Sequence, residues 1–296
     1  MEADALSGIS DMGDTGAIQT LTVVGASGKM GQLIVQRSRQ AGLACFELDA
    51  PLDAQASREA AERALPHSDL VLLSVPAQAV AEVLAKLAPL IPKGCIVADV
   101  CSVKVRPLEE MTALHPGPVV GTHPLFGPRP PEGEPLRVAV CPGRAEASSR
   151  GTVCSGQDEA ACRAVEQWLA RLDFAPFRAT AEEHDRAMAY VQGLNFVSTV
   201  AYLAAQASRE DFDRFLTPSF KRRLDAAKKL ILEDAGLFRL IFEANPYSLE
   251  AVRSFRNYLN VAAGGDLELL VERAKGWWKE DGGEAASVPR TDETDS

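Results

Sequence analysis

Two short segments carry side chains that could do chemistry at the ends of expected strands. The segment "DVCSVK" places Ser102 and Lys104 just after a strand expected over 94–100. The segment "GTHPLFGP" places His123 just after the apolar run "VVG". A neutral imidazole is a natural base for removing a hydroxyl proton while hydride leaves the same carbon. These segments therefore predict a proton-transfer site, with a purely structural histidine as the alternative.

A glycine cluster, "VVGASGKMG" at 23–31, runs from an expected strand straight into a helical pattern. This order is the dinucleotide-binding fingerprint, because glycine lets backbone amides approach a pyrophosphate at a helix N-terminus. The GxGxxG pattern is broken, since Ala26 holds its first position and Gly28 and Gly31 hold the other two. Asp49 ends the second expected strand, 21 residues after Gly28, where a carboxylate could accept hydrogen bonds from a ribose or could simply close a turn. Such a carboxylate repels a 2′-phosphate, which favours NAD over NADP.

The elements that must position these residues alternate between short apolar runs and helical patterns from residue 18 to about 178. This alternation predicts βαβ units and a parallel sheet. From Glu182 the strand signals stop, and long apolar helical patterns suggest burial against a partner subunit. We therefore predict an α/β fold, a Rossmann-like, doubly wound, mostly parallel sheet followed by an all-α dimerisation domain. The predicted divisions are a disordered tail at 1–17, an NAD-binding domain at 18–180, a helical substrate and dimerisation domain at 181–279, and an acidic disordered tail at 280–296. Within the first domain, the Gly, Ser and Ala rich segment 143–160 is expected to be an exposed loop.

Composition narrows the class of protein. The chain has 296 residues, 46% of them hydrophobic, and a formal charge of −10. Most of that charge lies in the two acidic end segments, which are typical of solvated tails. We expect no nucleic-acid partner, no membrane span and a cytoplasmic location. Six cysteines without CxxC spacing or a nearby histidine pattern indicate no metal site.

Three further histidines have less obvious roles. His67 and His115 sit beside proline in turns that look exposed, and we expect both to be bystanders. His184 lies in "EEHD" at an expected helix start, where it is expected to help fix the domain junction.

Five segments together resemble one family. They are "VVGASGKMG", "DLVLLSVP", "VADVCSVK", "GTHPLFGP" and "EEHDRAMAYVQGL". In this order and spacing, over about 20–278, the chain resembles prephenate dehydrogenases, most of all the dehydrogenase half of the bifunctional enzymes that also carry chorismate mutase. We expect no mutase helix before the domain, because only about 17 residues precede it. The resemblance implies NAD-dependent oxidative decarboxylation of prephenate to 4-hydroxyphenylpyruvate, with hydride passing from C4 to NAD and the ring carboxylate leaving. By position, His123 matches the histidine that accepts the C4 hydroxyl proton, and Ser102 matches the serine that hydrogen-bonds to histidine and substrate.

The chain departs from this family on the substrate side. Lys229 stands where the bifunctional enzymes have an arginine that grips a substrate carboxylate, and lysine makes only a point contact. Either Lys229 or the neighbouring Lys228 still serves a dianionic substrate, or the substrate has changed, or Lys229 is an exposed helix residue. Gln192 with Gly193, and Arg129, also replace other residue types. We expect a rebuilt substrate pocket around an unaltered catalytic centre.

These considerations leave several functions open. The alternatives to prephenate are 4-amino-4-deoxyprephenate, giving 4-aminophenylpyruvate in natural-product (antibiotic) biosynthesis, and arogenate. An alternative of another class is an inactive, dinucleotide-binding regulatory homodimer. The predicted cofactor contacts are Gly25, Ala26, Ser27, Gly28, Lys29, Met30, Gly31, Asp49, Val75 and Pro76. The predicted substrate contacts are Ser102, Lys104, His123, Gln192 and Lys229.

Overall fold

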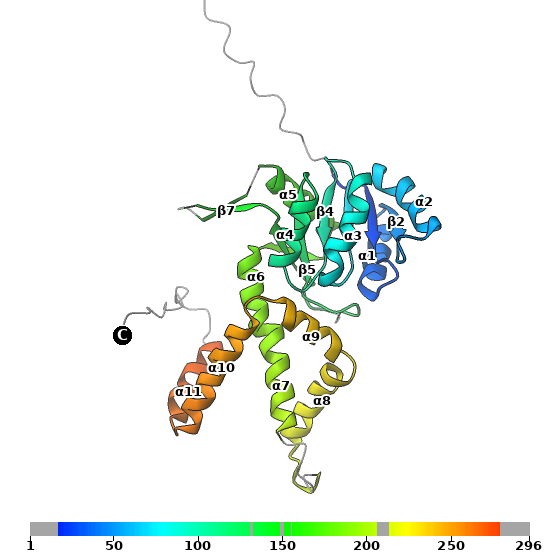
Figure 1. Cartoon of the computed structure of the whole chain (residues 1–296). Helices are drawn as coiled ribbons and strands as arrows, with labels where there is room; N and C mark the ends of the chain where they lie inside the picture. Colours follow the sequence, from blue (N-terminus) through cyan, green and yellow to red (C-terminus); the bar gives the residue numbers. More distant parts are fainter. Residues whose placement is uncertain (1–16, 131–132, 149–150, 155, 206–212, 279–296) are drawn as a thin grey trace, which may run out of the picture. The chain divides into compact units, whose positions relative to one another are not determined.

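The computed structural model describes residues 17–130, 133–148, 151–154, 156–205 and 213–278 (Figure 1). The chain divides into two compact units, 1–248 and 249–296. The first unit holds the sheet and most of the helices. The boundary predicted at 180/181 falls within this first unit and stays a prediction. The two predicted tails, Ala17 apart, lie outside the described residues.

A seven-stranded sheet forms the centre of the first unit, in the order β2-β1-β3-β4-β5-β6-β9. Its strands are β1 (Thr20–Val24), β2 (Ala44–Leu48), β3 (Leu70–Leu73), β4 (Ile96–Asp99), β5 (Val119–Pro124), β6 (Arg137–Pro142) and β9 (Ala175–Arg178). The five strands from β2 to β5 pair in parallel, and β6 runs antiparallel to β5 while pairing in parallel with β9. The mostly parallel sheet predicted from the alternating pattern is confirmed.

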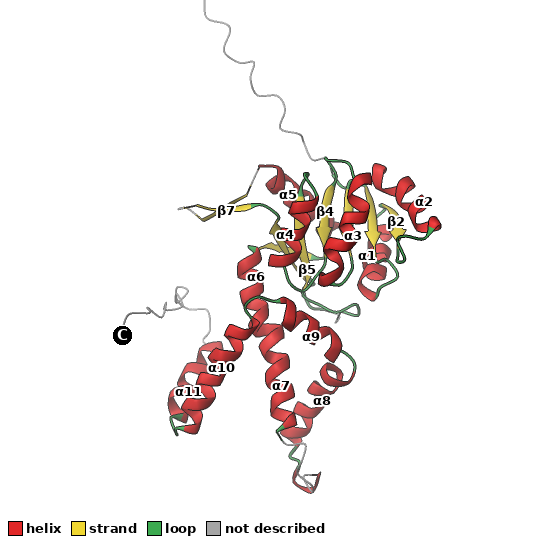
Figure 2. Cartoon of the chain, viewed as in Figure 1, coloured by secondary structure: helices red, strands yellow, loops and turns green. Residues whose placement is uncertain are grey.

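Helices cover both faces of the sheet (Figure 2). They are α1 (Lys29–Gln40), α2 (Gln55–Ala64), α3 (Val80–Leu87), α4 (Val105–Leu114) and α5 (Gly156–Arg171). Because successive side chains of a strand point to opposite faces, Leu70 and Leu72 pack with α1 and α5, whereas Val71 and Leu73 pack with α2, α3 and α4. Burial on both faces explains why these strands are apolar throughout rather than alternating.

The chain reverses its direction of winding between β1 and β3, since β1 pairs with β2 on one side and β3 on the other. In doubly wound sheets, ligands bind beyond the carboxyl ends of the strands at such a reversal. The strand ends that meet at this edge are followed by Gly25, Ser74 and Val100, and β5 carries His123 near its own end. The fold thus gathers the predicted site segments at one edge.

The prediction of an exposed loop at 143–160 is wrong. Strands β7 (Ala145–Ser148) and β8 (Gly151–Cys154) pair as an antiparallel hairpin, and α5 follows directly at Gly156. Main-chain hydrogen bonds hold a hairpin ladder without any alternation of apolar side chains. The absence of a hydrophobic period therefore did not exclude strands.

The chain after β9 is helical over its described residues, as expected. Its elements are α6 (Ala181–Met188), a π-helical segment (Ala189–Leu194), α7 (Asn195–Ala204), α8 (Pro218–Leu232), α9 (Ala235–Ala244), α10 (Ser248–Ala263) and α11 (Leu267–Ala274). Short 3₁₀ turns precede α8 and follow α11. The first of these helices starts with a capping box, in which Thr180 and Glu183 bond to each other's backbone amides.

None of the helices in the described ranges is long and apolar enough to cross a membrane.

The glycine turn packs too closely for any larger residue. Gly25 has φ +83°, and a Cβ at this position would lie 2.4 Å from the carbonyl oxygen of Ser74 at the end of β3. A Cβ on Gly31 would lie 2.3 Å from the carbonyl oxygen of Gly25. The turn can therefore sit against both β3 and the start of α1 only because these two positions lack side chains.

We expect Gly25→Ala to lower the free energy of unfolding by about 3 kcal/mol, because it adds a backbone clash to the left-handed strain. Gly42→Ala is the matched control, since Gly42 has φ +80° but open space around it. That change carries only the strain, about 1 kcal/mol. Urea unfolding of both variants measures the difference, and equal losses would contradict the close packing.

Candidate active site

The start of α1 is built to receive an anion. Its N-cap, Gly28, provides no side-chain cap, and the first turn contains no acidic residue. The first-turn amides of Lys29, Met30 and Gly31 have no acceptor within the helix. These free N–H groups and the positive end of the helix dipole suit a phosphate, and the close glycine packing leaves backbone rather than side chains facing it. The turn therefore fits the pyrophosphate of a dinucleotide.

Asp49 ties the end of β2 to this turn. Its Oδ1 accepts hydrogen bonds from the backbone N–H of Ser27 at 3.0 Å and from the Ser27 hydroxyl at 2.8 Å. The carboxylate is half-buried and retains lone pairs for further hydroxyl donors. Closing the turn and accepting a ribose hydroxyl are thus compatible, and the second role stays a prediction.

His123 is buried inside the edge of the sheet and pairs with a second histidine. It is 3% exposed, and its Nδ1 lies 2.8 Å from Nε2 of His184 on α6. The two rings meet edge to face at 5.0 Å. The expected role of His184 at the domain junction is therefore incomplete, because this side chain contacts the predicted catalytic residue directly.

Asp185 holds this pair in place. Its Oδ1 accepts from His184 Nδ1 at 2.8 Å and from the backbone N–H of Lys104 at 2.7 Å, and its Oδ2 accepts from the N–H of Val105 at 2.9 Å. The N-cap residue of α4, Lys104, supplies no side-chain cap of its own. Asp185 therefore caps α4 from a distant helix, and Asn245 fixes the backbone of Asp185 in turn through a 2.7 Å bond to its carbonyl.

Burial keeps His123 neutral. It holds the pKa of His123 well below its ordinary value of 6.5, with His184 and the Lys104 ammonium acting in the same direction. No described residue hydrogen-bonds to Nε2 of His123. A neutral ring at this position can accept a proton from a bound molecule.

Lys104, a predicted substrate contact, has its side chain turned inward, and its role in binding substrate stays a prediction. The Lys104 side chain is 0% exposed, and its ammonium pairs with Asp99 Oδ2 at 2.5 Å and donates to the Thr122 carbonyl oxygen at 2.6 Å. Asp99 lies at the end of β4 and Thr122 on β5, so this lysine holds two strand ends together. The sequence pattern placed it correctly at the edge but could not show that its side chain turns inward.

The remaining predicted contacts stay predictions. Ser102 is half-buried, and among the described contacts it makes no hydrogen bond to His123. Gln192 lies in the π-helical segment with a buried Oε1 that has no partner in the described part of the chain. Lys229 is 71% exposed and lies 3.9 Å from Asp234, so its ammonium can still reach a ligand. Val75 and Pro76 follow the end of β3, beside Gly25.

Sequence reasoning missed His184 and Asp185 as members of the site. The capping-box spacing of Thr180 and Glu183 was readable and predicts where α6 starts, but no local pattern shows that its first turn meets β5. The expectation that His115 lies in an exposed turn is wrong. Its side chain is 1% exposed, and its Nε2 lies 2.9 Å from the Cys95 carbonyl oxygen. Burial lowers its pKa as well.

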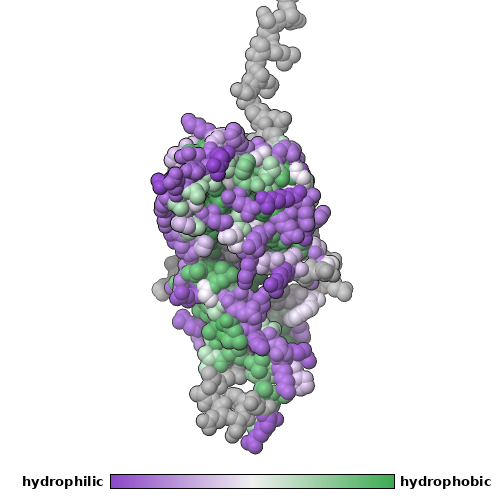
Figure 3. Space-filling model, turned by 90° about the vertical axis from the view of Figure 1, so that its right-hand side faces the viewer, coloured by the Kyte–Doolittle hydropathy of each residue, from purple (hydrophilic) through white to green (hydrophobic). Residues whose placement is uncertain are grey.

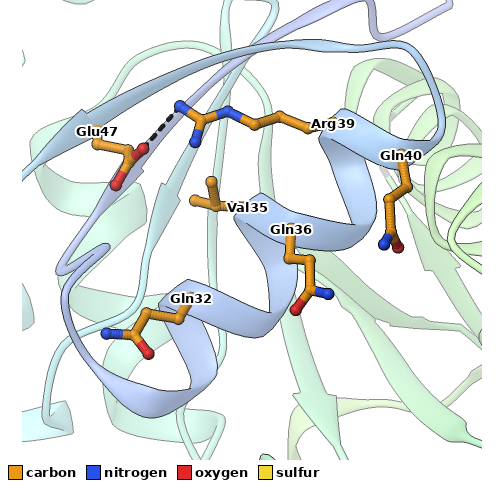
Figure 4. Close-up of a pocket in the computed structure, with 6 residues that line it drawn as sticks. All are labelled: Gln32, Val35, Gln36, Arg39, Gln40 and Glu47. Carbon is orange, nitrogen blue, oxygen red and sulfur yellow. Dashed lines mark ion pairs between the residues drawn. The ribbon is translucent and has the colours of Figure 1, made fainter.

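A pocket lies over α1 and β2 (Figure 4). It is lined by Gln32, Val35, Gln36, Arg39, Gln40 and Glu47. The Arg39–Glu47 ion pair at its rim spans 2.6 Å, with both side chains partly exposed, so it contributes little to stability. Within the described residues, no group of three His, Cys, Asp or Glu side chains is arranged to hold a metal ion.

Comparison with known proteins agrees with this geometry. Residues 34–133 match the family described as prephenate dehydrogenase, nucleotide-binding domain. The T-protein of Enterobacter agglomerans is 32% identical over 245 residues, covering 80% of this chain and 60% of that protein. The T-protein of Haemophilus influenzae is 27% identical over 243 residues, covering 81% of this chain and 60% of that protein. The chain thus spans about 60% of the length of these two relatives.

Solved structures show the same fold. Prephenate dehydrogenase from A. aeolicus, in complex with hydroxyphenyl propionate and NAD+, matches with a TM-score of 0.67 and 21% identity over 88% of this chain and 96% of that one. Synechocystis arogenate dehydrogenase matches with a TM-score of 0.65 and 19% identity over 87% of this chain and 98% of that one. Fold and site together define a nucleotide-binding protein of the doubly wound α/β class. Within that class, the chain resembles the prephenate dehydrogenase family, whose nucleotide-binding domain residues 34–133 match.

We expect the free energy of unfolding to fall as the pH drops below about 6.5. The pKa of His123 and of His115 is lowered in the folded protein, so the unfolded chain binds protons that the folded chain does not. The loss should continue down to the lowered native pKa of each group, at up to about 1.4 kcal/mol per pH unit for each histidine. Urea unfolding between about pH 7.5 and pH 5.5 measures the slope. His115→Gln should reduce it, whereas the exposed His67→Gln should not. An unchanged slope in His115→Gln would contradict the assignment.

Proposed function

We propose that this chain is an NAD-dependent dehydrogenase that oxidatively decarboxylates prephenate or a close analogue. The observation that carries the proposal is a neutral, buried His123 at the same sheet edge as an uncapped glycine turn. The match of residues 34–133 to the nucleotide-binding domain of prephenate dehydrogenases and the NAD+ complex of the A. aeolicus enzyme support it.

The chain's own groups have three tasks in this reaction. The glycine turn and Asp49 hold the dinucleotide, which when bound supplies the hydride acceptor. His123 takes the C4 hydroxyl proton at Nε2 as hydride leaves C4. The ring carboxylate departs as carbon dioxide, and the electron pair of the broken bond enters the ring, which leaves a phenolate oxygen that takes the proton back from His123. Aromatisation drives the step, so the protein mainly aligns hydride, proton and carboxylate.

The substituent at C4 divides the candidate substrates. Prephenate carries a hydroxyl there and gives 4-hydroxyphenylpyruvate, whereas 4-amino-4-deoxyprephenate carries an amine and gives 4-aminophenylpyruvate. The amine substrate remains a candidate because the chain differs from the family at predicted substrate positions. These positions are Lys229, Gln192 and Gly193, whereas Ser102 and His123 are retained. Arogenate, which differs in the side-chain amine, is a third substrate; a relative from Methanocaldococcus jannaschii, 26% identical over 195 residues, is described as a probable arogenate/prephenate dehydrogenase.

The direct test mixes the protein, NAD and each of these three substrates and follows the absorbance of reduced cofactor. Turnover with one of them supports the proposal and selects the substrate. No absorbance change with any of them would leave an inactive, dinucleotide-binding regulatory protein as the better account.

We also propose that two copies of the chain pair through their helical parts. The second unit exposes large apolar side chains at Leu249, Leu259, Leu267, Leu269, Val271, Trp277 and Trp278. The first unit exposes others on its helices, including Leu232 and Leu237, and Figure 3 shows hydrophobic side chains gathered on the surface of the helical part. Large exposed apolar side chains gathered on one helical unit are typical of protein–protein interfaces.

We expect His123→Asn to retain NAD binding and to lower kcat by about 100- to 10,000-fold, because it removes the positioned base. Steady-state kinetics and cofactor titration measure the two effects. His67→Asn is the control and should behave as the parent protein. Turnover near the parent level in His123→Asn would remove this residue from the mechanism.

Lys229→Ala should raise KM about 10- to 100-fold with little change in kcat, if the ammonium holds a substrate carboxylate. Lys228→Ala tests the neighbouring lysine, and Lys221→Ala is an exposed control on the same helix. If KM is unchanged in Lys229→Ala, its side chain is only a solvated one.

Sedimentation velocity should give a particle of twice the chain mass for the parent protein. Leu269→Glu on α11 should shift it toward the monomer, because a buried charge opposes association. Glu268→Gln changes the charge of the same helix without altering the apolar surface and should remain dimeric. A monomeric parent protein would overturn the pairing.

A further inference from the structure

We propose that His184 and Asp185 are positioning residues that hold His123 in one tautomer, with the proton on Nδ1 and Nε2 bare. The inference deepens the proposed function, because it says why Nε2 rather than Nδ1 is the base. It rests on the chain of 2.8 Å contacts from Asp185 through His184 to His123.

The donor and acceptor of each hydrogen bond can be assigned in turn, beginning with Asp185. Its two oxygens accept from the backbone N–H groups of Lys104 and Val105, and a backbone N–H can only donate. Two N–H donors at the N-terminus of α4 suit an acceptor-only carboxylate. Oδ1 therefore also accepts from His184, whose proton must lie on Nδ1.

The second step follows from the chemistry of a neutral imidazole. With its proton on Nδ1, His184 presents Nε2 as a lone pair. A 2.8 Å contact between two ring nitrogens needs one proton, so Nδ1 of His123 donates it. That leaves Nε2 of His123 unprotonated and able to accept a proton from substrate.

The charges packed around the pair oppose the reverse arrangement. In that arrangement His184 would be a cation and would donate to His123. That arrangement would add a second buried positive charge to a cluster that already holds the ammonium of Lys104. Once His123 has accepted the substrate proton, the new cation donates through neutral His184 to the Asp185 carboxylate. The positive charge thus forms where a buried negative charge already lies within two hydrogen bonds.

The experiment reads the tautomer without any substrate. In full-length protein labelled with ¹⁵N-histidine, at about pH 8, long-range ¹H–¹⁵N correlation distinguishes protonated from bare ring nitrogens. Single substitutions at the four histidines assign the signals. We expect His123 to be protonated at Nδ1 only, in the absence and presence of NAD. A proton on Nε2 of His123 would overturn the inference, whether or not any candidate substrate turns over.

Two variants separate positioning from folding. His184→Asn leaves the Asp185 cap on α4 in place, and Asp185→Asn keeps the size of the side chain but offers an amide that can donate. In both we expect His123 to lose its single tautomer, kcat to fall about 100- to 10,000-fold and the affinity for NAD to stay within about twofold. The exposed His67→Asn is the control. A parent-like tautomer and kcat in folded His184→Asn would refute the positioning role, and that variant decides the matter should Asp185→Asn not fold.

Discussion

One buried carboxylate, that of Asp185, joins the parts of this molecule that must meet for chemistry. It caps α4 across 80 residues of chain and bonds to His184, which in turn contacts His123 on β5. An ionised carboxylate is costly to bury without partners. Here two backbone amides and an imidazole N–H donate to it. Moving α6 away from the sheet would leave the carboxylate without its two backbone donors. The position of α6 and the state of the site are therefore set by the same interaction.

The sheet edge supplies the second half of the arrangement. Parallel strands end at a common edge, which brings the glycine turn after β1 and His123 on β5 to one side of the sheet. The Lys104–Asp99 pair, with the Thr122 carbonyl, holds the ends of β4 and β5 together from inside. A buried pair of this kind is weak evidence for added stability, but removing one partner would leave an unpaired charge. Its clearest consequence is that the ends of β4 and β5 are held together next to His123.

Much of the fold could be predicted from the sequence, because strand and helix periods are local. The parallel sheet, the glycine turn and the place of His123 follow from such patterns. The partnership of His123 with His184 could not be predicted, since it joins residues 61 apart that no period connects. Lys104 shows a different limit: its place after β4 was readable, but the inward direction of its side chain was not. The hairpin of β7 and β8 was missed because backbone pairing leaves no hydrophobic pattern.

The predicted substrate contacts Gln192 and Lys229 lie in the helical part of the chain, outside the sheet edge that carries His123. The proposed reaction requires the dinucleotide and His123 to face the same substrate carbon. A crystal structure of the NAD complex tests this most directly. We expect the pyrophosphate at the amides that follow Gly28 and the nicotinamide ring opposite Nε2 of His123. A pyrophosphate bound elsewhere, or a nicotinamide ring remote from that nitrogen, would contradict the account.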